Sequence, residues 1–211
     1  MRLGLLGPLL GPSPEDDAPL EQALRFLLHD VAVDRAIYLG IDPALDRVVH
    51  RWAAGLVGGD PGDAALFSRA AAQCATASAD EIAAFLEAER ERRTLKVFES
   101  LPGDGTRVIE LLGDKVVVMI YDKAHFDEED ILPASVLVFG KSDEPVIKQV
   151  GSRWFLSPGS FKTAGVMTLE DSEEGIQLAV FDESGKEIER QLLRVGRGAK
   201  LKVSGAAGAD S

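Results

Sequence analysis

The spacing of hydrophobic residues changes along the chain, from helical and buried-strand patterns before residue 94 to a period of two after it. Residues 2–7 and 36–40 are short apolar runs, which are typical of buried strands. Apolar residues at helical spacing predict amphipathic helices over 20–29 and 43–54. The first half of the chain therefore predicts strands and helices in alternation.

Capping signals predict where the second helix begins and ends. Asp42 before Pro43 is typical of a helix start, because Asp caps the first amides and Pro suits the first turn. Gly55 is a suitable C-terminal stop. We expect residues 56–59 to form a short third strand.

Residues 62–94 are rich in alanine and are predicted to be helical. Ser78 and Glu81 match a capping box, in which each side chain binds the backbone amide of the other residue. Glu89 and Arg93 are four residues apart, which favours a surface ion pair of small energetic value. We expect the charged run that contains them to face solvent.

The second half is dominated by predicted strands, with hairpin turns at Gly113-Asp114 and Ser184-Gly185. A half with alternating elements followed by a strand-rich half indicates an α/β fold in which two stacked sheets are flanked by helices. We expect one domain over residues 1–195 and a flexible Gly/Ala-rich tail over 196–211. The predicted strands cover residues 95–99, 107–112, 115–121, 135–140, 146–150, 152–156, 164–169, 175–182 and 187–194.

Composition narrows the possible environments and partners. The chain has 211 residues, 45% hydrophobic and 27% charged, with a net charge of −12. Such an acidic surface disfavours nucleic acid and anionic membranes, and no apolar run reaches the roughly 20 residues that span a bilayer. Cys74 is the single cysteine, so an intrachain disulfide is excluded, and we expect a small core residue in a cytoplasmic protein.

Two segments near the ends of the predicted domain combine a strand with a recognisable turn. Residues 2–7 lead into Pro8-Leu9-Leu10-Gly11, and residues 153–156 lead into Ser157-Pro158-Gly159-Ser160. They resemble the Asp-x-His-Gly motif and the Asn-Pro-Gly-Ser turn of the calcineurin-like metallophosphoesterases, of the small single-domain phosphodiesterase type. Here Pro8 stands at the Asp position, Leu10 at the His position and Ser157 at the Asn position.

Four further segments resemble motifs of the same superfamily, in the same order. Ile41 occupies the place of the metal-bridging Asp, Gly59 that of a ligand Asn, and Tyr121 that of a His. Lys141 and Asp143 occupy the places of two His residues in a Gly-His-Thr-His segment.

The resemblance implies a two-sheet sandwich whose strand-end loops, in the enzymes, hold two divalent metals that activate a hydroxide. Such a site requires hard oxygen ligands and imidazoles in a fixed cluster. Without a register shift Asp143 alone among the substituted positions offers a carboxylate, and Pro8 and Leu10 bind no metal. A shift of one residue would place Asp60, instead of Gly59, at the Asn position. The resemblance therefore implies the fold without catalytic residues, without a metal and without another cofactor.

The first functional hypothesis is a catalytically inactive member that binds another protein as a scaffold or regulatory module. The superfamily includes a noncatalytic scaffold subunit that serves as a docking platform. The sequence leaves the identity of the partner open, and a homo-oligomer is an alternative.

In two other hypotheses the protein acts on or binds a small phosphate-containing molecule. A rebuilt phosphoesterase site is one of them. Another is a phosphate- or nucleotide-binding module that does not hydrolyse its ligand, unless Lys141 simply pairs with Asp143 or Glu144. The rebuilt site would draw on Asp42, Asp46, His50, Asp60 and Asp143, although Asp46 and His50 are more simply a surface pair on one helix. The anion site would draw on Lys141, Ser142, Gly159 and Ser160.

Overall fold

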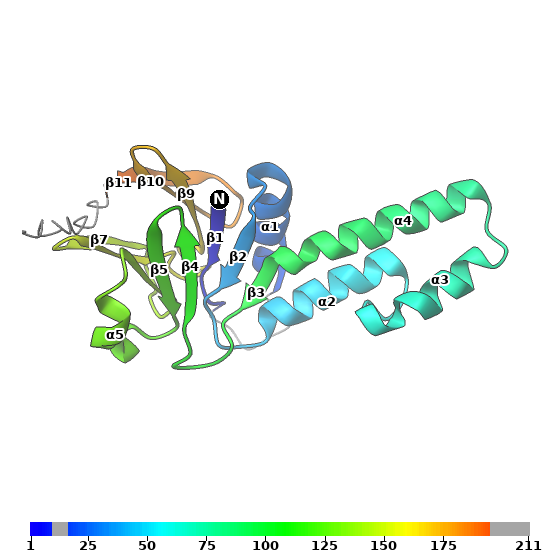
Figure 1. Ribbon diagram of the computed structural model, residues 1–211, viewed down its shortest axis with the longest axis horizontal. Coiled ribbons are helices and arrows are strands. Elements are labelled where there is room, and N and C mark those ends of the chain that lie inside the picture. Colours follow the sequence, from blue (N-terminus) through cyan, green and yellow to red (C-terminus); the bar gives the residue numbers. More distant parts are fainter. Residues whose placement is uncertain (10–16, 195–211) are drawn as a thin grey trace, which may run out of the picture.

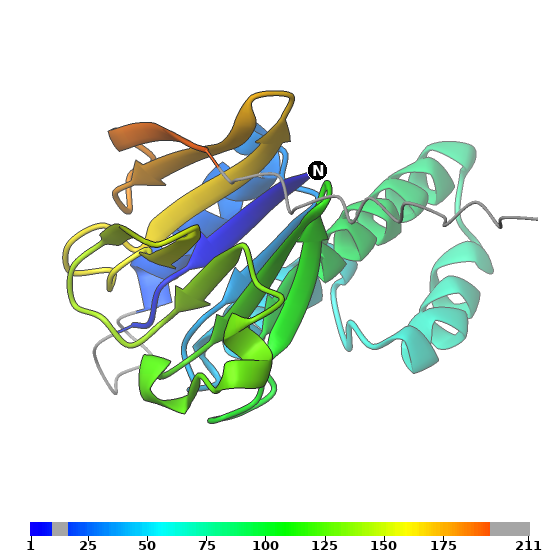
Figure 2. The ribbon, with the colours of Figure 1, turned by 60° about the vertical axis from the view of Figure 1, so that its left-hand side comes forward.

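Two mixed β-sheets lie face to face in the computed structural model, which describes residues 1–9 and 17–194 (Figures 1 and 2). In the first sheet the strand order is β11-β10-β9-β1-β2-β3, and in the second it is β4-β5-β6-β8-β7. The first sheet comprises β1 (Arg2–Leu6), β2 (Arg35–Tyr38), β3 (Phe98–Ser100), β9 (Val166–Ser172), β10 (Gly175–Phe181) and β11 (Glu187–Leu193). The second comprises β4 (Val108–Leu112), β5 (Lys115–Ile120), β6 (Val136–Phe139), β7 (Val146–Val150) and β8 (Arg153–Ser157).

Helices of the first half cover the outer face of the first sheet, as the alternation predicts, and the short segment 126–131 packs on part of the outer face of the second sheet. The main core lies between the sheets, and side chains such as Leu5, Met119 and Leu178 are fully buried there. A second core joins the other face of the first sheet to the helices α1 and α2 through Leu24, Val48 and their neighbours. The helices and short helical turns are α1 (Ala18–Arg25), η2 (Phe26–Val31), α2 (Ala44–Val57), η3 (Asp63–Ala65), α3 (Leu66–Cys74), α4 (Ala79–Thr94), η4 (Leu95–Val97), η5 (Lys123–His125) and α5 (Glu128–Ile131).

The predicted α/β sandwich is confirmed, including all the strands of the second half. Both hairpin turns are present, with Gly113 and Gly185 in the left-handed region at φ +65° and +82°. The first predicted strand of this half begins late, because residues 95–97 form the turn η4. Leu10 and the predicted tail 196–211 lie outside the described residues. In the described part of the chain no helix is long and apolar enough to cross a membrane.

The prediction of a third strand over 56–59 is wrong, because α2 continues to Val57. Gly55 lies inside this helix, and the residue that ends it is Gly58, at φ +67°, whose amide binds the carbonyl of Ala54. The apolar pair Leu56-Val57 extends the helical pattern by half a turn, too short a run to form a strand of its own.

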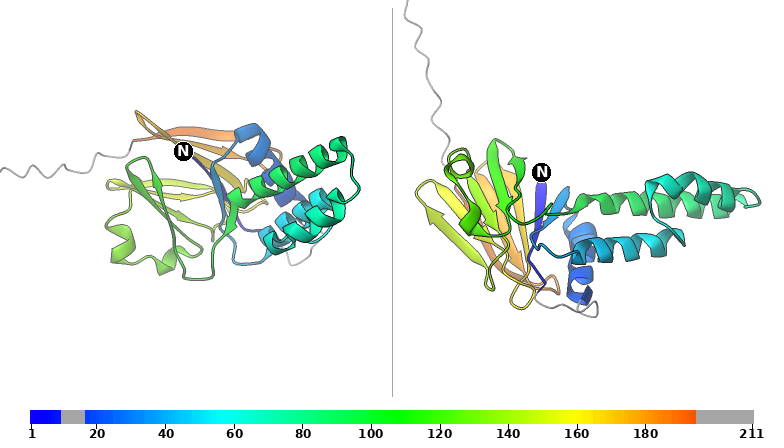
Figure 3. Two further views of the ribbon diagram at one scale, coloured as in Figure 1. Left: turned by 45° about the vertical axis from the view of Figure 1, so that its right-hand side comes forward. Right: turned by 90° about the horizontal axis from the view of Figure 1, so that it is seen from below.

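Helices α2, α3 and α4 form an arm that projects away from the sandwich (Figures 1 and 3). The capping box that begins α4 is confirmed: the Ser78 amide donates to Glu81 at 2.7 Å, and the Glu81 amide donates to the Ser78 hydroxyl. Cys74 is exposed at the end of α3, so the prediction of a core residue is wrong. Helix α3 has no buried residue among those described, and it contacts α4 and the short turn η3.

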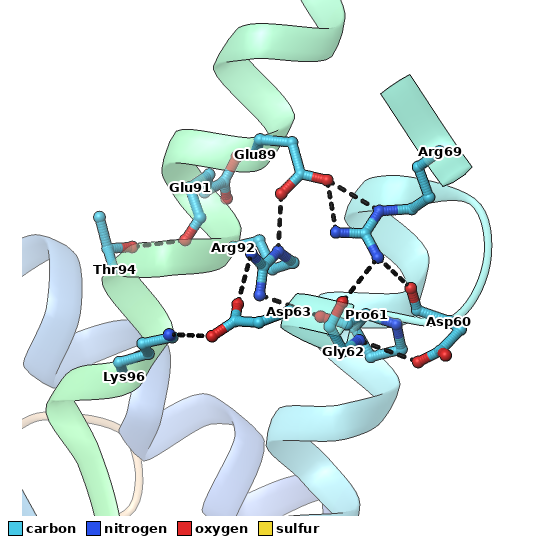
Figure 4. Close-up of polar contacts among 10 residues, drawn as sticks. All are labelled: Asp60, Pro61, Gly62, Asp63, Arg69, Glu89, Glu91, Arg92, Thr94 and Lys96. Carbon is cyan, nitrogen blue, oxygen red and sulfur yellow. Dashed lines mark hydrogen bonds and ion pairs between the residues drawn. The ribbon is translucent and has the colours of Figure 1, made fainter. Parts of the chain in front are cut away.

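Buried ion pairs fix the two sides of the arm together, as Figure 4 shows. The Glu89 carboxylate pairs with Arg69 of α3 at 2.6 Å and with Arg92 of α4 at 2.8 Å. Arg92 also reaches Asp63, which binds Lys96. The predicted surface pair of Glu89 with Arg93 is therefore wrong, because Glu89 faces α3 and the turn that follows α2.

The charge state of Glu89 follows from these partners. Burial alone would raise the pKa of this carboxyl group. The hydrogen bonds and charges of Arg92 and Arg69 outweigh burial and hold the pKa below its usual value. Glu89 is therefore an anion at neutral pH, and it compensates two guanidinium groups that have little access to water.

Candidate functional site

The carboxyl ends of the parallel strands meet at one edge of the sandwich. Strand β1 runs parallel to β2, and β6 runs parallel to both β5 and β8. The loops that follow these strands carry most of the substituted positions. They are Pro8 after β1, Ile41 after β2, Tyr121 after β5, Lys141 and Asp143 after β6, and Ser157 at the end of β8.

Glycine lets the backbones of these loops approach one another closely. A Cβ atom on Gly7 would lie 1.8 Å from the carbonyl oxygen of Gly159, and one on Gly140 would lie 2.1 Å from that of Leu39. Both contacts join a loop of one sheet to a loop of the other. The loops are tied further by a hydrogen bond from the Gly7 amide to the carbonyl of Gly165, at 2.8 Å.

A buried tyrosine ties together the loops after β1 and β2. The Tyr38 hydroxyl donates to the Asp42 carboxylate at 2.8 Å and accepts from the Leu9 amide at 3.1 Å. Burial is the main cause that raises the pKa of Tyr38, so the hydroxyl stays protonated. Sequence reasoning missed this contact, although the four-residue separation of Tyr38 and Asp42 at a strand end was the available signal.

Asp42 supports the start of α2, close to the role that the sequence predicts. Its other carboxylate oxygen accepts from the Ala44 amide at 2.9 Å. The capping position itself is Pro43, one residue later than expected, and Ala44 is the first helical residue. Asp42 is therefore occupied by contacts within its own loop.

Lys141 pairs with Asp122 across the ends of β5 and β6, with Nζ 2.5 Å from Oδ2. The suggested pairing with Asp143 or Glu144 is wrong, because the lysine reaches the carboxylate that follows Tyr121 on the neighbouring parallel strand. The hydrogen bond from Lys141 to Asp122 and the negative charge of that carboxylate raise the pKa of Lys141. Two oppositely charged side chains thus lie together at this end of the second sheet.

The polar groups of the predicted anion site have partners within the chain. The Gly159 amide donates to the hydroxyl of buried Ser157 at 3.2 Å, and the Ser160 amide donates to the carbonyl of Asp143 at 3.1 Å. The Ser142 hydroxyl donates to the carbonyl of Glu144 at 2.7 Å. The bond between Ser160 and Asp143 holds the β6–β7 connection against the loop after β8, and the other two bonds are local to each segment.

One of the predicted positions, Gly59, lies away from the strand-end edge. Ile41 is at this edge and is 49% exposed. Gly59 follows the far end of the 14-residue helix α2, roughly 20 Å along the helix axis from the strand ends. The loop that follows β3 lies at the strand-end edge, where Gly59 was expected. Strand β3 is parallel to β2, so both end at this edge, and the Leu101 amide donates to the carbonyl of Tyr38. The assignment of Gly59 fails because it relied on a strand over residues 56–59.

The residues suggested for a rebuilt site separate into two groups. Asp46, His50 and Asp60 line one hollow of about 420 Å³ between α2 and the base of α4, beside Arg92 and Lys96. Asp46 accepts a hydrogen bond from the Ser100 hydroxyl at 3.2 Å. Asp42 and Asp143 belong to the strand-end edge instead.

A dinuclear metal centre does not fit the groups found at the strand ends. Over residues 1–9 and 17–194, no group of three or more His, Cys, Asp and Glu side chains is placed to hold a metal ion. Proline at position 8 offers no donor, and the Lys141 ammonium is a cation where the enzymes would hold metals. Hard divalent ions require several carboxylate or imidazole ligands in one cluster. The edge as it stands supports packing and ion pairing.

The sequence matches no protein-family model and no curated protein. The structure resembles Vps29 of Entamoeba histolytica complexed with Zn²⁺, with a TM-score of 0.50, 14% identity, and coverage of 92% of this chain and 99% of that one. It also resembles an uncharacterised Streptococcus pneumoniae protein described as a predicted phosphoesterase, with a TM-score of 0.49, 11% identity, and coverage of 90% of this chain and 97% of that one. A third similar structure is an archaeal phosphodiesterase, with a TM-score of 0.46, 11% identity, and coverage of 86% of this chain and 100% of that one. At 14% identity the similarity to Vps29 establishes the fold alone.

Proposed function

We propose that this protein is a noncatalytic module of metallophosphoesterase-like fold that binds another protein in the cytoplasm. The observation that carries the proposal is the apolar surface of the arm. The side chain of Phe67 is 84% exposed on α3, and that of Leu86 is 47% exposed on the facing α4. They line a groove of about 320 Å³ together with Leu66, Ala70 and Phe85. Aromatic and aliphatic side chains gathered in an exposed hollow are typical of protein contact sites.

The strand-end edge supports the noncatalytic part of the proposal. Metal-dependent phosphoester hydrolysis needs ions that activate water and neutralise charge on the phosphate. In this chain the Lys141–Asp122 pair and the buried Tyr38–Asp42 contact occupy that edge. The fold alone does not decide the matter, because the similar Vps29 structure was obtained with Zn²⁺. The residues at the strand ends are what supports the noncatalytic proposal.

Substitutions on the arm test the proposal. A Phe67→Asp/Leu86→Asp variant should lose a specific partner that copurifies with the full-length protein from its native cells. The matched control is Ile188→Asp, since Ile188 is 53% exposed on β11, which forms the edge of the first sheet opposite β3 and the arm (Figure 1). Partner recovery unchanged by the arm variant would contradict the proposal.

The two small-molecule alternatives make different predictions. A rebuilt phosphoesterase would hydrolyse an activated phosphodiester, and an anion-binding module would be stabilised against heat by phosphate or nucleotide without turnover. No contact described above favours either alternative, since the amides and hydroxyls of the predicted anion site already bind within the chain.

A further inference from the structure

A groove of about 630 Å³ lies at the edge of the sandwich opposite the strand-end site. The groove is lined by residues at the amino ends of β5 and β8 and by the turn between β9 and β10. Its apolar part consists of Val116, Leu132, Pro133 and Ala134. Its acidic part consists of Asp114, Asp171, Glu173 and Glu174.

The basic residues of the groove are already engaged. Lys115 Nζ lies 2.8 Å from Asp114 and 3.2 Å from Asp171. The Arg153 guanidinium donates to the carbonyls of Ile131 and Leu132. Glu173 and Glu174 are exposed in the turn above them. The groove thus offers apolar contacts beside a surplus of negative charge.

The described chain ends at the rim of this groove. Strand β11 pairs with β10 so that Leu193 lies opposite Ile176, and a Cβ atom on Gly175 would lie 3.6 Å from Cα of Arg194. The indole of Trp154 donates to the carbonyl of Arg194 at 3.3 Å. Gly175 lines the groove, and Trp154 follows Arg153, which also lines it. Arg194, the last described residue, therefore lies beside the acidic turn.

The sequence that follows has the complementary chemistry. Residues 195–211 contain Arg197, Lys200 and Lys202 and a single acidic residue, Asp210, in a chain whose net charge is −12. Lys200-Leu201-Lys202-Val203 alternates basic and apolar side chains. An extended segment with this alternation presents its charges on one side and its apolar groups on the other.

We propose that residues 197–203 bind in this groove of the same chain, with the lysines against the acidic turn and Leu201 and Val203 against the apolar part. Lys200 is six residues beyond Arg194, so an extended connection of up to roughly 20 Å reaches across the groove. Tethering at the rim gives the segment an effective concentration in the millimolar range, so weak contacts suffice.

Carbodiimide crosslinking of the full-length protein, followed by mass spectrometry, tests this placement. We expect Lys200 or Lys202 to be linked to Glu173 or Glu174 within monomers, to the same extent at low and high protein concentration. Glu173→Gln/Glu174→Gln should remove the links, whereas Glu183→Gln, in the exposed turn between β10 and β11, should not affect them. Links found only in dimers, or none to the groove, would overturn the proposal.

A synthetic peptide of residues 195–205 provides a second readout in the full-length protein. A Lys200→Glu/Lys202→Glu variant has a repelled tail and an open groove, so it should bind the labelled peptide at least fivefold more tightly than the wild type does. Binding should weaken with salt, because exposed charges are screened. Equal affinities of the two proteins would contradict occupation of the groove by the tail.

Discussion

Gly7 and Gly140 show how single residues shape the strand-end edge. At each position the carbonyl of a loop from the other sheet occupies the space that a side chain would need. The sequence resemblance assigns Gly140 to a turn of one motif and leaves Gly7 at the end of the predicted strand 2–7, and only the structure identifies the carbonyls that they contact. Tyr38 also shapes this edge, because its single hydroxyl forms hydrogen bonds with the loop after β1 and the loop after β2.

A methyl group at Gly140 tests this close packing. Gly140→Ala should lower the free energy of unfolding by about 1–3 kcal/mol, because overpacking forces the backbone of Leu39 to move. Gly55→Ala, inside α2 where an added Cβ atom would have no neighbour within 4 Å, should instead raise it by roughly 0.5–1 kcal/mol. Urea denaturation of both variants measures the difference. A Gly140→Ala protein as stable as the wild type would contradict tight contact between the loops.

At the scale of elements, the strands of the second half could be predicted from their short apolar runs and the turns between them, although β6 is buried on both faces and shows no alternation in burial. The arm is less predictable. Its helical content and its capping box could be read from residues 62–94, but its partners could not. Glu89 and Arg92 read as solvent-exposed charges in the sequence, and they are buried because α3 and the turn after α2 pack over them.

Neutralising Glu89 should weaken the arm. Glu89→Gln leaves Arg69 and Arg92 poorly compensated and should lower the free energy of unfolding by about 3 kcal/mol, the usual scale for a broken buried pair. Glu87→Gln, in a pair whose side chains are both 72% exposed, should cost no more than about 1 kcal/mol. Equal effects in urea denaturation would contradict a buried network.

The same network predicts a dependence on pH. The pKa of Glu89 is held below its ordinary value of 4.5, so its contribution to stability is complete above that pH and is lost as the pH falls through the folded-state pKa. The stability difference between the wild type and Glu89→Gln should therefore be constant near neutral pH and shrink below about pH 4.5. A difference that stays constant down to about pH 3 would contradict this assignment.

The N-terminal cap of α4 is a separate test of the arm. Ser78→Ala removes the acceptor for the Glu81 amide and should destabilise the helix by about 1 kcal/mol. Ser68→Ala, within α3 and exposed, should have little effect. Amide hydrogen exchange in the first turn of α4 distinguishes the two variants, since only loss of the cap should accelerate it.

At the scale of the whole molecule, fold and chemistry are specified by different residues. The fold could be predicted because turns and apolar periodicity recur along the chain, and the order of both sheets confirms it. The placement of site residues was less predictable, as Gly59 shows, because one misassigned strand moves a residue by the length of a helix. The partner of Lys141 was likewise set by the pairing of β5 with β6, which the sequence does not state.

The central claim is that the strand-end edge supports contacts within the protein in place of a catalytic metal pair. Metal analysis of the full-length protein tests it most directly, after purification without chelators from cells grown with manganese, iron and zinc. The account predicts far less than one equivalent of these metals per chain, because Pro8, Tyr121 and Lys141 stand where ligands would be required. Two tightly bound equivalents per chain would contradict it.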